Sequence, residues 1–199
     1  MKSVTGSDVH RIFSREIEQL EDGVKNSKNP YHFFTLSTLV EKNEVSSRTV
    51  VLRSVSSDPL GLTFNADRRS PKVSQLRGSE GCSVLFYDNA RRVQLRLKCS
   101  PSVSHMDDLS EAVWSATPLQ SRKCYMGEHV PSTEVGQWKP NIPASYTKRD
   151  PDRGDSESGY INFCVVNLNI KSMDILELHH DGHIRFSVDA SDNFTFIAP

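Results

Sequence analysis

Ser70-Pro71-Lys72 has the composition of an anion site at the start of a helix. Pro71 suits the first helical position and Gly78 the residue past the last turn, so the sequence predicts a short helix from Ser70 to Arg77. A helix start offers unpaired backbone N–H groups, and a Ser hydroxyl with a Lys ammonium could complete a phosphate site there. Ser is also a common N-cap, and taken alone the motif favours an ordinary cap beside a solvated lysine.

Two arginines and a glutamine lie in strand-like segments. Arg48 and Arg53 belong to a Val- and Thr-rich run over 46–55 that predicts one strand. Five positions apart, they should face opposite sides of it, so one could meet a phosphate and the other a second ligand, or both could form surface ion pairs. Gln94 lies between two apolar residues, and its amide suits either a heterocycle edge or a cross-strand hydrogen bond.

Other polar clusters fit specific chemistry less well. Arg68-Arg69 and Arg91-Arg92 could contact nucleic acid, but few aromatic residues interleave with them, which favours a solvated rim. The histidine-rich run over 179–183 resembles a metal cluster, yet it falls at a predicted hairpin turn without the partner residues of known sites. We therefore predict no metal and no nucleic acid. The sequence has no Ser-His-Asp order, Walker loop or dinucleotide fingerprint.

Positive charge is concentrated in the middle of the chain. The segment from Arg48 to Ser100 has ten Lys and Arg against four Asp and Glu, whereas the whole chain has a net charge of −1. A local excess of this kind on strand-rich sequence indicates a bound anion. The pI of about 6.7 argues against bulk nucleic-acid binding.

The chain of 199 residues predicts a single domain over 1–199. Many short strands, one helix with Ser7 or Asp8 as its N-cap and a few shorter helices favour a β-barrel with α additions. The Pro-, Asp- and Ser-rich stretch over 139–159 predicts a mobile loop. No apolar run could span a membrane, and the start of the chain is polar, so we expect a cytoplasmic protein with four reduced cysteines and no membrane partner.

Two motifs together resemble the pyridoxamine 5′-phosphate oxidase family of FMN-binding split barrels. They are the run Phe64-Asn65-Ala66-Asp67-Arg68-Arg69-Ser70-Pro71-Lys72 and the strand Arg91-Arg92-Val93-Gln94-Leu95-Arg96-Leu97. The similarity is strongest over 48–98 and weaker across the first helix and over 168–199. It implies a six-stranded antiparallel split β-barrel with flanking short helices, and a homodimer with FMN between its subunits.

The resemblance also implies which residues contact the cofactor. The family's flavin-contacting strand, ribityl region, phosphate turn and ring contacts correspond here to Arg48, Val50, Val51, Leu52, Asn65, Ala66, Ser70, Lys72, Gln94 and Arg185. Two positions depart from the oxidases: Pro71 replaces an arginine of the phosphate turn, and Leu176 replaces a stacking tryptophan.

The substrate side departs further from the oxidases. The resemblance implies that Arg53 and Ser121 lie near a substrate phosphate and that His183 lies on the substrate side. Val113 and Thr117 stand where a tyrosine and an arginine would grip that phosphate, and Asp181 replaces another arginine. A vitamin B6 phosphate would lose several contacts, each worth on the order of 1.5–3 kcal/mol. We therefore expect FMN binding, with pyridoxamine 5′-phosphate a poor substrate.

Three functional hypotheses follow. The first is an FMN-dependent oxidoreductase that acts on a small molecule, with no side chain required as nucleophile. The second is a non-catalytic flavin-binding or sensing module on the same barrel, since a fold does not fix a function. Nucleic-acid binding through the arginine pairs is the third and the weakest. The sequence identifies neither the substrate nor the electron acceptor.

Overall fold

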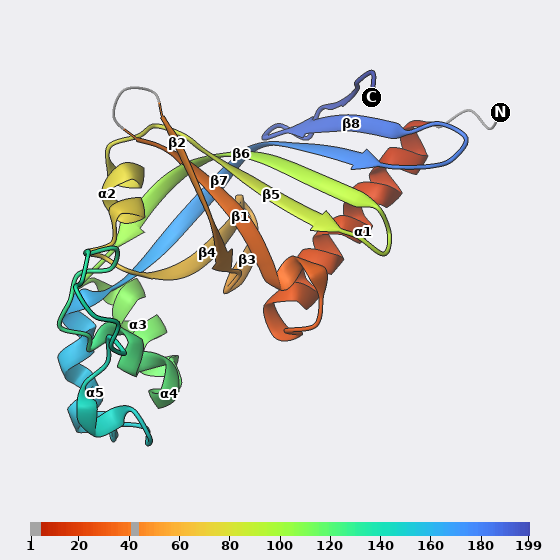
Figure 1. Cartoon of the computed structure of the whole chain (residues 1–199). Coiled ribbons are helices and arrows are strands. Elements are labelled where there is room, and N and C mark those ends of the chain that lie inside the picture. The colour runs from red at the N-terminus through yellow and green to blue at the C-terminus, as the bar shows by residue number, and fades with distance from the viewer. Residues whose placement is uncertain (1–4, 41–43) are drawn as a thin grey trace. The chain divides into compact units, whose positions relative to one another are not determined.

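The computed structural model describes residues 5–40 and 44–199, which form mainly antiparallel β-structure with flanking helices (Figure 1). The predicted fold class is confirmed at this level. The polar start over 1–4, on which the expectation of no leader rested, lies outside the described residues. No helix of the described residues is long and apolar enough to cross a membrane.

The described strands form one nine-stranded sheet, more than the six strands that the resemblance implies. Its order is β2-β1-β5-β6-β7-β4-β3, with β8 paired to β7 and β9 to β8. Short strands such as β3 and β9 account for part of the difference. The strands are β1 (Phe33–Leu39), β2 (Val45–Val51), β3 (Ser54–Ser57), β4 (Leu60–Asp67), β5 (Cys82–Asp88), β6 (Val93–Ser104), β7 (Phe163–Glu177), β8 (Ile184–Asp189) and β9 (Phe194–Phe196).

The chain divides into two compact units. Unit 1 comprises residues 1–64, 79–101 and 167–199, and unit 2 comprises 65–78 and 102–166. Unit 1 contains α1 (Gly6–Lys25), the short 3-10 helix η1 (Pro30–His32) and most of the sheet. The single split-barrel domain over 1–199 stays a prediction.

Side-chain alternation explains how the strands of unit 1 form a core. Along β5, residues 82, 84, 86 and 88 are buried and the residues between them are exposed. β6 repeats this pattern opposite β5, with Val84 facing Leu97 and Phe86 facing Leu95. Because successive side chains point to opposite faces of a strand, one face of the sheet becomes continuous core. Its other members include Phe34, Leu36, Leu52, Leu62, Phe64, Leu168, Ile175 and Phe186.

The outer face of the same strands is exposed and partly apolar. In the register of β1, β2 and β5, the outward positions bring large apolar side chains together with serines and threonines. Such a contiguous apolar face on a sheet is typical of an interaction surface. The exposed apolar residues on these strands are Phe33 (49%), Leu39 (52%), Val45 (65%), Leu85 (37%) and Tyr87 (45%).

Helix α1 runs between the β8–β9 region and η1 (Figure 1). Its N-cap is Thr5, not the predicted Ser7 or Asp8. Asp8 instead accepts hydrogen bonds from the Thr5 N–H (3.0 Å) and hydroxyl (2.8 Å), which lower the pKa of Asp8. Near the other end, a Cβ on Gly23 would lie 2.8 Å from the Tyr31 carbonyl carbon, so this close approach requires glycine.

A network of buried charges joins α1 to the sheet of unit 1. Glu16 is fully buried, and it accepts hydrogen bonds from Arg91 (2.7 and 3.1 Å) and from the Tyr31 hydroxyl (2.7 Å). Arg91 also binds Asp88 at 2.5 Å. Arg15 continues the network, because it pairs with both Glu16 and the buried Glu177. Each buried carboxylate is thus compensated by a guanidinium.

Unit 2 is organised around an aromatic cluster and a buried cation. Trp114, Phe163 and Val165 form its core, with Tyr125 and Tyr160 packed against them. The guanidinium of fully buried Arg122 stacks 4.6 Å from the Trp114 ring centroid and pairs with Glu157 at 2.7 Å. The helices of this unit are α2 (Pro71–Arg77), α3 (Asp108–Ala116), α4 (Leu119–Arg122), η3 (Lys123–Tyr125), η4 (Ala144–Tyr146), α5 (Arg153–Ser156) and η5 (Glu157–Asn162).

Three predicted segments differ in the structure. The single strand over 46–55 is wrong: β2 ends at Val51, and β3 begins at Ser54. The expectation of short strands fails at β7, which is one continuous strand of 15 residues. The predicted loop over 139–159 contains η4 and α5, while its mobility stays a prediction.

The Glu16 network predicts a large stability effect. Glu16→Ala should lower the free energy of unfolding by about 3–5 kcal/mol, because it leaves Arg91 and the Tyr31 hydroxyl without their buried acceptor. Chemical denaturation measures this. Glu21→Ala, on the exposed side of α1, is the matched control and should change little. An equal loss of unfolding free energy in Glu16→Ala and Glu21→Ala would mean that the buried network contributes nothing beyond helix propensity.

Candidate functional site

The Ser70–Lys72 turn of unit 2 places an ammonium over a buried hydroxyl. Ser70 occupies the N-cap position of α2, but its side chain makes no capping hydrogen bond. The Ser70 hydroxyl instead donates to the Asp67 carbonyl oxygen (2.6 Å) and accepts from Lys72 Nζ (3.1 Å). The interpretation of Ser70 as an ordinary cap is therefore wrong.

The residues just before this turn are tied into unit 2. Arg69 forms a bidentate pair with the Asp67 carboxylate (2.7 and 3.0 Å) and donates to the Gly127 carbonyl (3.0 Å). The hydrogen bond to Asp67 raises the pKa of Arg69. Arg68 donates from Nε to the Ile161 carbonyl at 2.9 Å. The prediction that Arg68 and Arg69 belong to a solvated rim is therefore wrong for Arg69, which is half-buried and whose charge Asp67 neutralises.

Asn65 has a buried polar atom that nothing in the described residues satisfies. Its side-chain oxygen Oδ1 is shielded from solvent and has no hydrogen-bond partner there. Buried acceptors are nearly always paired, so an orphan of this kind indicates a missing donor. The neighbouring predicted residue, Ala66, is itself buried, and its carbonyl accepts a hydrogen bond from Cys164 Sγ (3.3 Å). Asn65 fits a polar ligand that carries hydroxyl or N–H donors.

On unit 1, half-buried Arg48 is held by neutral oxygens. Its guanidinium donates to the Leu36 carbonyl (3.4 Å), Thr38 Oγ1 (2.5 Å) and Ser46 Oγ (2.7 Å). Burial lowers the pKa of Arg48, which means that its charged form is incompletely solvated here.

The predicted backbone contacts that follow Arg48 are partly engaged already. Val50 and Val51 pair with Phe34 and Phe33 of β1. The side chain of Leu52 is fully buried, and its N–H donates to the His32 carbonyl at 2.9 Å. Because only alternate residues of an antiparallel pair exchange hydrogen bonds and β2 is the edge strand of this path, every second residue of β2 keeps its N–H and C=O for the role that the resemblance implies.

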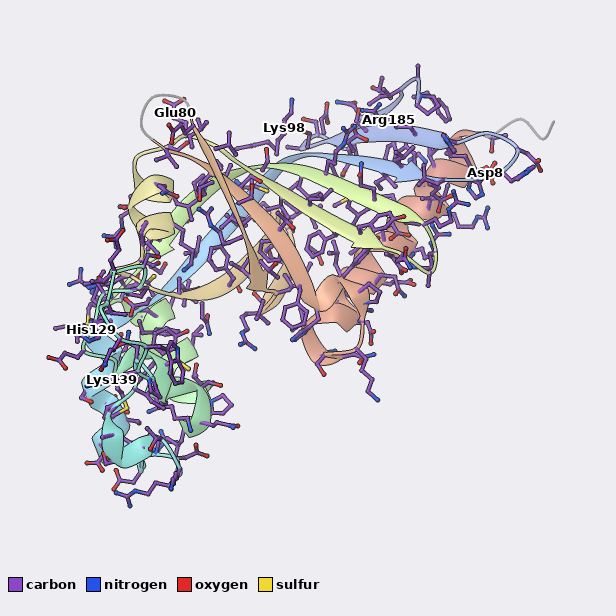
Figure 2. The ribbon with its side chains drawn as sticks, viewed as in Figure 1. Asp8, Glu80, Lys98, His129, Lys139 and Arg185 are labelled. Atoms are coloured by element: carbon purple, nitrogen blue, oxygen red, sulfur yellow. The ribbon has the colours of Figure 1, made fainter. Side chains whose placement is uncertain are left out.

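Arg185 lines a hollow on the outer face of the unit 1 sheet. Its guanidinium and that of Arg96 share the carboxylate of Asp174, at 2.9 and 2.6 Å. Lys98 adds a further positive charge to the hollow, whose volume is about 450 Å³. Figure 2 shows Lys98 and Arg185 extending from the same side of the sheet. Hydroxyls of Ser37, Ser83 and Ser172 complete the lining.

Gln94 is half-buried on β6, directly opposite Tyr87. Its amide has no hydrogen bond to any described residue, so the alternative of a cross-strand hydrogen bond is wrong. An amide that is partly shielded yet unused by the protein is suited to an external donor or acceptor.

The three predicted substrate residues lie on different elements. Arg53 is exposed in the break between β2 and β3, with its N–H bonded to the Thr63 carbonyl (2.9 Å), so the argument that Arg48 and Arg53 share one strand does not hold. Ser121 is half-buried on α4 of unit 2. His183 is exposed in the β7–β8 turn, where its Nδ1 accepts from the His179 N–H at 3.3 Å.

Sequence reasoning missed two features, one in each unit. Asp174 lies 78 residues from Arg96, and no local pattern indicates that the two pair. The orphaned oxygen of Asn65 likewise depends on the folded surroundings rather than on the motif. Within the described residues, no group of three or more His, Cys, Asp or Glu side chains could hold a metal ion, the histidine-rich turn included.

The ion pairs of Asp174 with Arg185 and Arg96 predict that the stability of the protein depends on pH. Burial alone would raise the pKa of Asp174, but hydrogen bonds from Arg185 and Arg96 outweigh it and lower this pKa. A carboxylate with a lowered folded pKa stabilises the protein above its unfolded pKa of about 3.9, and this contribution is lost as pH falls through the folded pKa. Asp174→Asn should therefore be less stable than wild type at neutral pH and equally stable in acid.

Thermal or chemical unfolding at a series of pH values measures this difference. Asp181→Asn is the control, since the side chain of Asp181 is 99% exposed and should contribute little. A stability difference for Asp174→Asn that is constant across pH would assign its effect to packing instead of charge.

The sequence matches one protein-family model. Residues 13–104 match the model described as pyridoxamine 5′-phosphate oxidase, FMN-binding domain. This stretch contains the Arg48 strand, the Ser70–Lys72 turn and Gln94. No curated protein matches the chain.

Solved structures share the fold. A pyridoxamine 5′-phosphate oxidase-related, FMN-binding protein from Nostoc punctiforme aligns with a TM-score of 0.72 at 19% identity, over 94% of this chain and 96% of its own. PhzG from Burkholderia lata, in complex with tetrahydrophenazine-1-carboxylic acid, aligns with a TM-score of 0.65 at 15% identity, over 95% and 91% of the two chains. ChuZ from Campylobacter jejuni gives 0.58 at 11% identity, over 95% of this chain and 63% of its own. The split-barrel fold is thereby confirmed.

Proposed function

Because residues 13–104 belong to the family of pyridoxamine 5′-phosphate oxidase FMN-binding domains, we propose that this protein binds FMN and acts as an FMN-dependent oxidoreductase on a small molecule. The observation that carries the proposal is the Ser70–Lys72 turn. There an ammonium is anchored on a buried hydroxyl within the matched stretch, five residues after the orphaned oxygen of Asn65.

The residues of unit 2 fit the polar half of FMN. Lys72 and Ser70 offer a cation and a hydroxyl for a phosphate, the group that charge-assisted hydrogen bonds hold best. The Asn65 oxygen lacks a donor, and the hydroxyls of a ribityl chain are donors. The negative charge of the Asp67 carboxylate would repel a phosphate, but the ion pair with Arg69 neutralises that charge.

The predicted residues of unit 1 supply groups of other kinds. Gln94 offers an unused amide for a ring edge, and Arg185 offers a guanidinium whose charge Asp174 only partly offsets, because Arg96 shares that carboxylate. Arg48 offers a half-buried cation among neutral oxygens. Bound FMN would supply the redox chemistry, and these residues would bind and orient it. Val50, Val51, Leu52 and Ala66 remain proposed backbone contacts.

Lys72→Ala tests the phosphate assignment. Losing one charge-assisted contact should weaken FMN binding about ten- to hundredfold, as measured by fluorescence titration or calorimetry. Arg77→Ala is the matched control: it removes a positive charge from the exposed end of the same helix and should leave the affinity nearly unchanged. Riboflavin, which lacks the phosphate, should bind wild type weakly and be insensitive to Lys72→Ala. Equal affinities for FMN and riboflavin would contradict the assignment.

The outer face of unit 1 supports a further part of the proposal, a homodimer. Phe33, Leu39, Val45, Leu85 and Tyr87 share this face by register, and each is at least 37% exposed. A second copy of the chain would bury them, and two-fold dimers are the commonest assembly of soluble oligomers. The cations of the neighbouring hollow face the same side and would lie at its edge.

Phe33→Glu should shift the protein towards monomer in sedimentation experiments, because dimerisation would then bury a carboxylate within this face. Val130→Glu is the control: Val130 is similarly exposed, at 44%, but it belongs to unit 2. Wild type that sediments as a monomer with FMN bound would contradict the dimer.

The substrate is expected to differ from pyridoxamine 5′-phosphate. Thr117 stands at a position where the oxidases would bind the substrate phosphate. Its hydroxyl already donates a hydrogen bond to the Val113 carbonyl at 2.7 Å. Asp181, at another, is fully exposed and negatively charged. The remaining cation there, Arg53, fits a smaller or less charged molecule better. We therefore propose a substrate without a dianionic phosphate.

One experiment separates the oxidoreductase from a non-catalytic flavin-binding module. The FMN-loaded protein is mixed without oxygen with candidate reductants, and its visible absorption is followed. Bleaching at rates of about 1 s⁻¹ or faster, with recovery in air, supports the oxidoreductase. Tight FMN binding without bleaching by any reductant supports the module.

A further inference from the structure

Cys82 and Cys99 lie directly opposite each other in the β5–β6 pair, and nothing in the proposed flavin site uses them. Directly opposed residues of an antiparallel pair have Cα atoms about 4.5–5.5 Å apart. Disulfide-bonded cysteines span about 4.4–6.8 Å between Cα atoms. Both side chains belong to the buried set of their strands and therefore point to the same face of the sheet. The backbone thus already places the two thiols at bonding range.

The two thiols also interact in the reduced protein. Both are free. The neighbouring Cys99 thiol lowers the pKa of Cys82, and the neighbouring Cys82 thiol together with burial raises the pKa of Cys99. Cys82 is 9% exposed and follows exposed Gly81, whereas Cys99 is 2% exposed. Cys82 is therefore both the more acidic and the more accessible thiol, the two properties that favour attack on an oxidant.

The other two cysteines lack this arrangement. Cys124 is exposed on η3 of unit 2. Cys164 is fully buried in unit 2, and its Sγ donates to the Ala66 carbonyl. They provide one accessible and one buried reference thiol within the same chain.

We propose that Cys82 and Cys99 form an oxidisable dithiol that hydrogen peroxide converts into a cross-strand disulfide. The Cys82 thiolate attacks one peroxide oxygen and breaks the O–O bond, which leaves a sulfenic acid on Cys82. The departing hydroxide takes up the proton that the Cys82 thiol had released, so one water forms. The Cys99 sulfur then attacks the Cys82 sulfur. The S–S bond forms, the S–O bond breaks, and a second water leaves with the Cys99 proton. The two thiols lose two electrons, and the peroxide gains them.

The disulfide would close the open end of the β5–β6 hairpin. The register runs through seven residue pairs from Cys82–Cys99 to Asp88–Val93, where the turn closes the other end. A covalent link at the open end restricts the unfolded chain without moving the folded strands. Oxidation should therefore raise the melting temperature rather than disrupt the sheet.

Peptide mapping tests the proposal on the full chain. Purified protein is treated with hydrogen peroxide, denatured in an alkylating reagent, digested and analysed by mass spectrometry. We expect a peptide pair joined through Cys82 and Cys99 and lighter by two hydrogens than the sum of its parts, while Cys164 is alkylated. Oxidation confined to Cys124, with Cys82 and Cys99 both alkylated, would overturn the proposal. So would a sulfinic acid on Cys82 without a cross-link.

Variants test the order of the two steps. Cys99→Ser should accumulate a sulfenic acid on Cys82 that a dione reagent traps, and Cys82→Ser should react more slowly at Cys99. Equal rates would overturn the assignment of Cys82 as the attacking thiol. Cys124→Ser should form the Cys82–Cys99 disulfide as wild type does, which excludes a route through exchange with Cys124. Loss of the disulfide in Cys124→Ser would overturn direct attack by the peroxide.

Discussion

The two-residue period of the β-strands is the constraint on which the structure of unit 1 depends. It assigns every second side chain of β5 and β6 to the core and leaves the others outside. The same rule puts Phe33, Leu85 and Tyr87 on an exposed face and places Cys82 against Cys99 on the buried one. A shift of register by one residue would exchange the two sets. The core, the proposed dimer face and the dithiol thus share one cause.

The sequence predicted well where local chemistry decides the structure. The helix at Pro71–Arg77 has proline at its start and glycine after its end, and β5 and β6 show clear alternation. The prediction failed where the context decides. The apolar run over 46–55 continues through Leu52, yet the N–H of Leu52 bonds to His32 in place of a β-strand partner, and the strand ends. Thr5 replaces Ser7 as the cap because Asp8 reaches back to it.

The candidate site was predictable in its motif residues but not in its electrostatics. Ser70 and Lys72 could be named from a tripeptide, whereas the roles of Asp174 and Arg69 depend on which charge lies beside which in the folded chain. The family match, over 13–104, covers the proposed cofactor residues except Arg185. Ser121, His183 and the departing positions Val113, Thr117 and Asp181 all lie beyond it. The cofactor can therefore be argued from the family, but the substrate must be argued from this chain alone.

Buried Arg122 has a consequence for how unit 2 moves. Its guanidinium donates to the carbonyls of Trp114 (2.7 Å), Ser115 (3.2 Å) and Thr117 (3.1 Å) at the end of α3, where helix carbonyls lack partners within the helix. It also binds Ser156 and Glu157, where α5 meets η5. The Arg122 side chain on α4 thus caps the end of α3 and links both helices to the segment where α5 meets η5. These three short segments are too small to be stable alone, so their amide protons should exchange with solvent through one shared opening event.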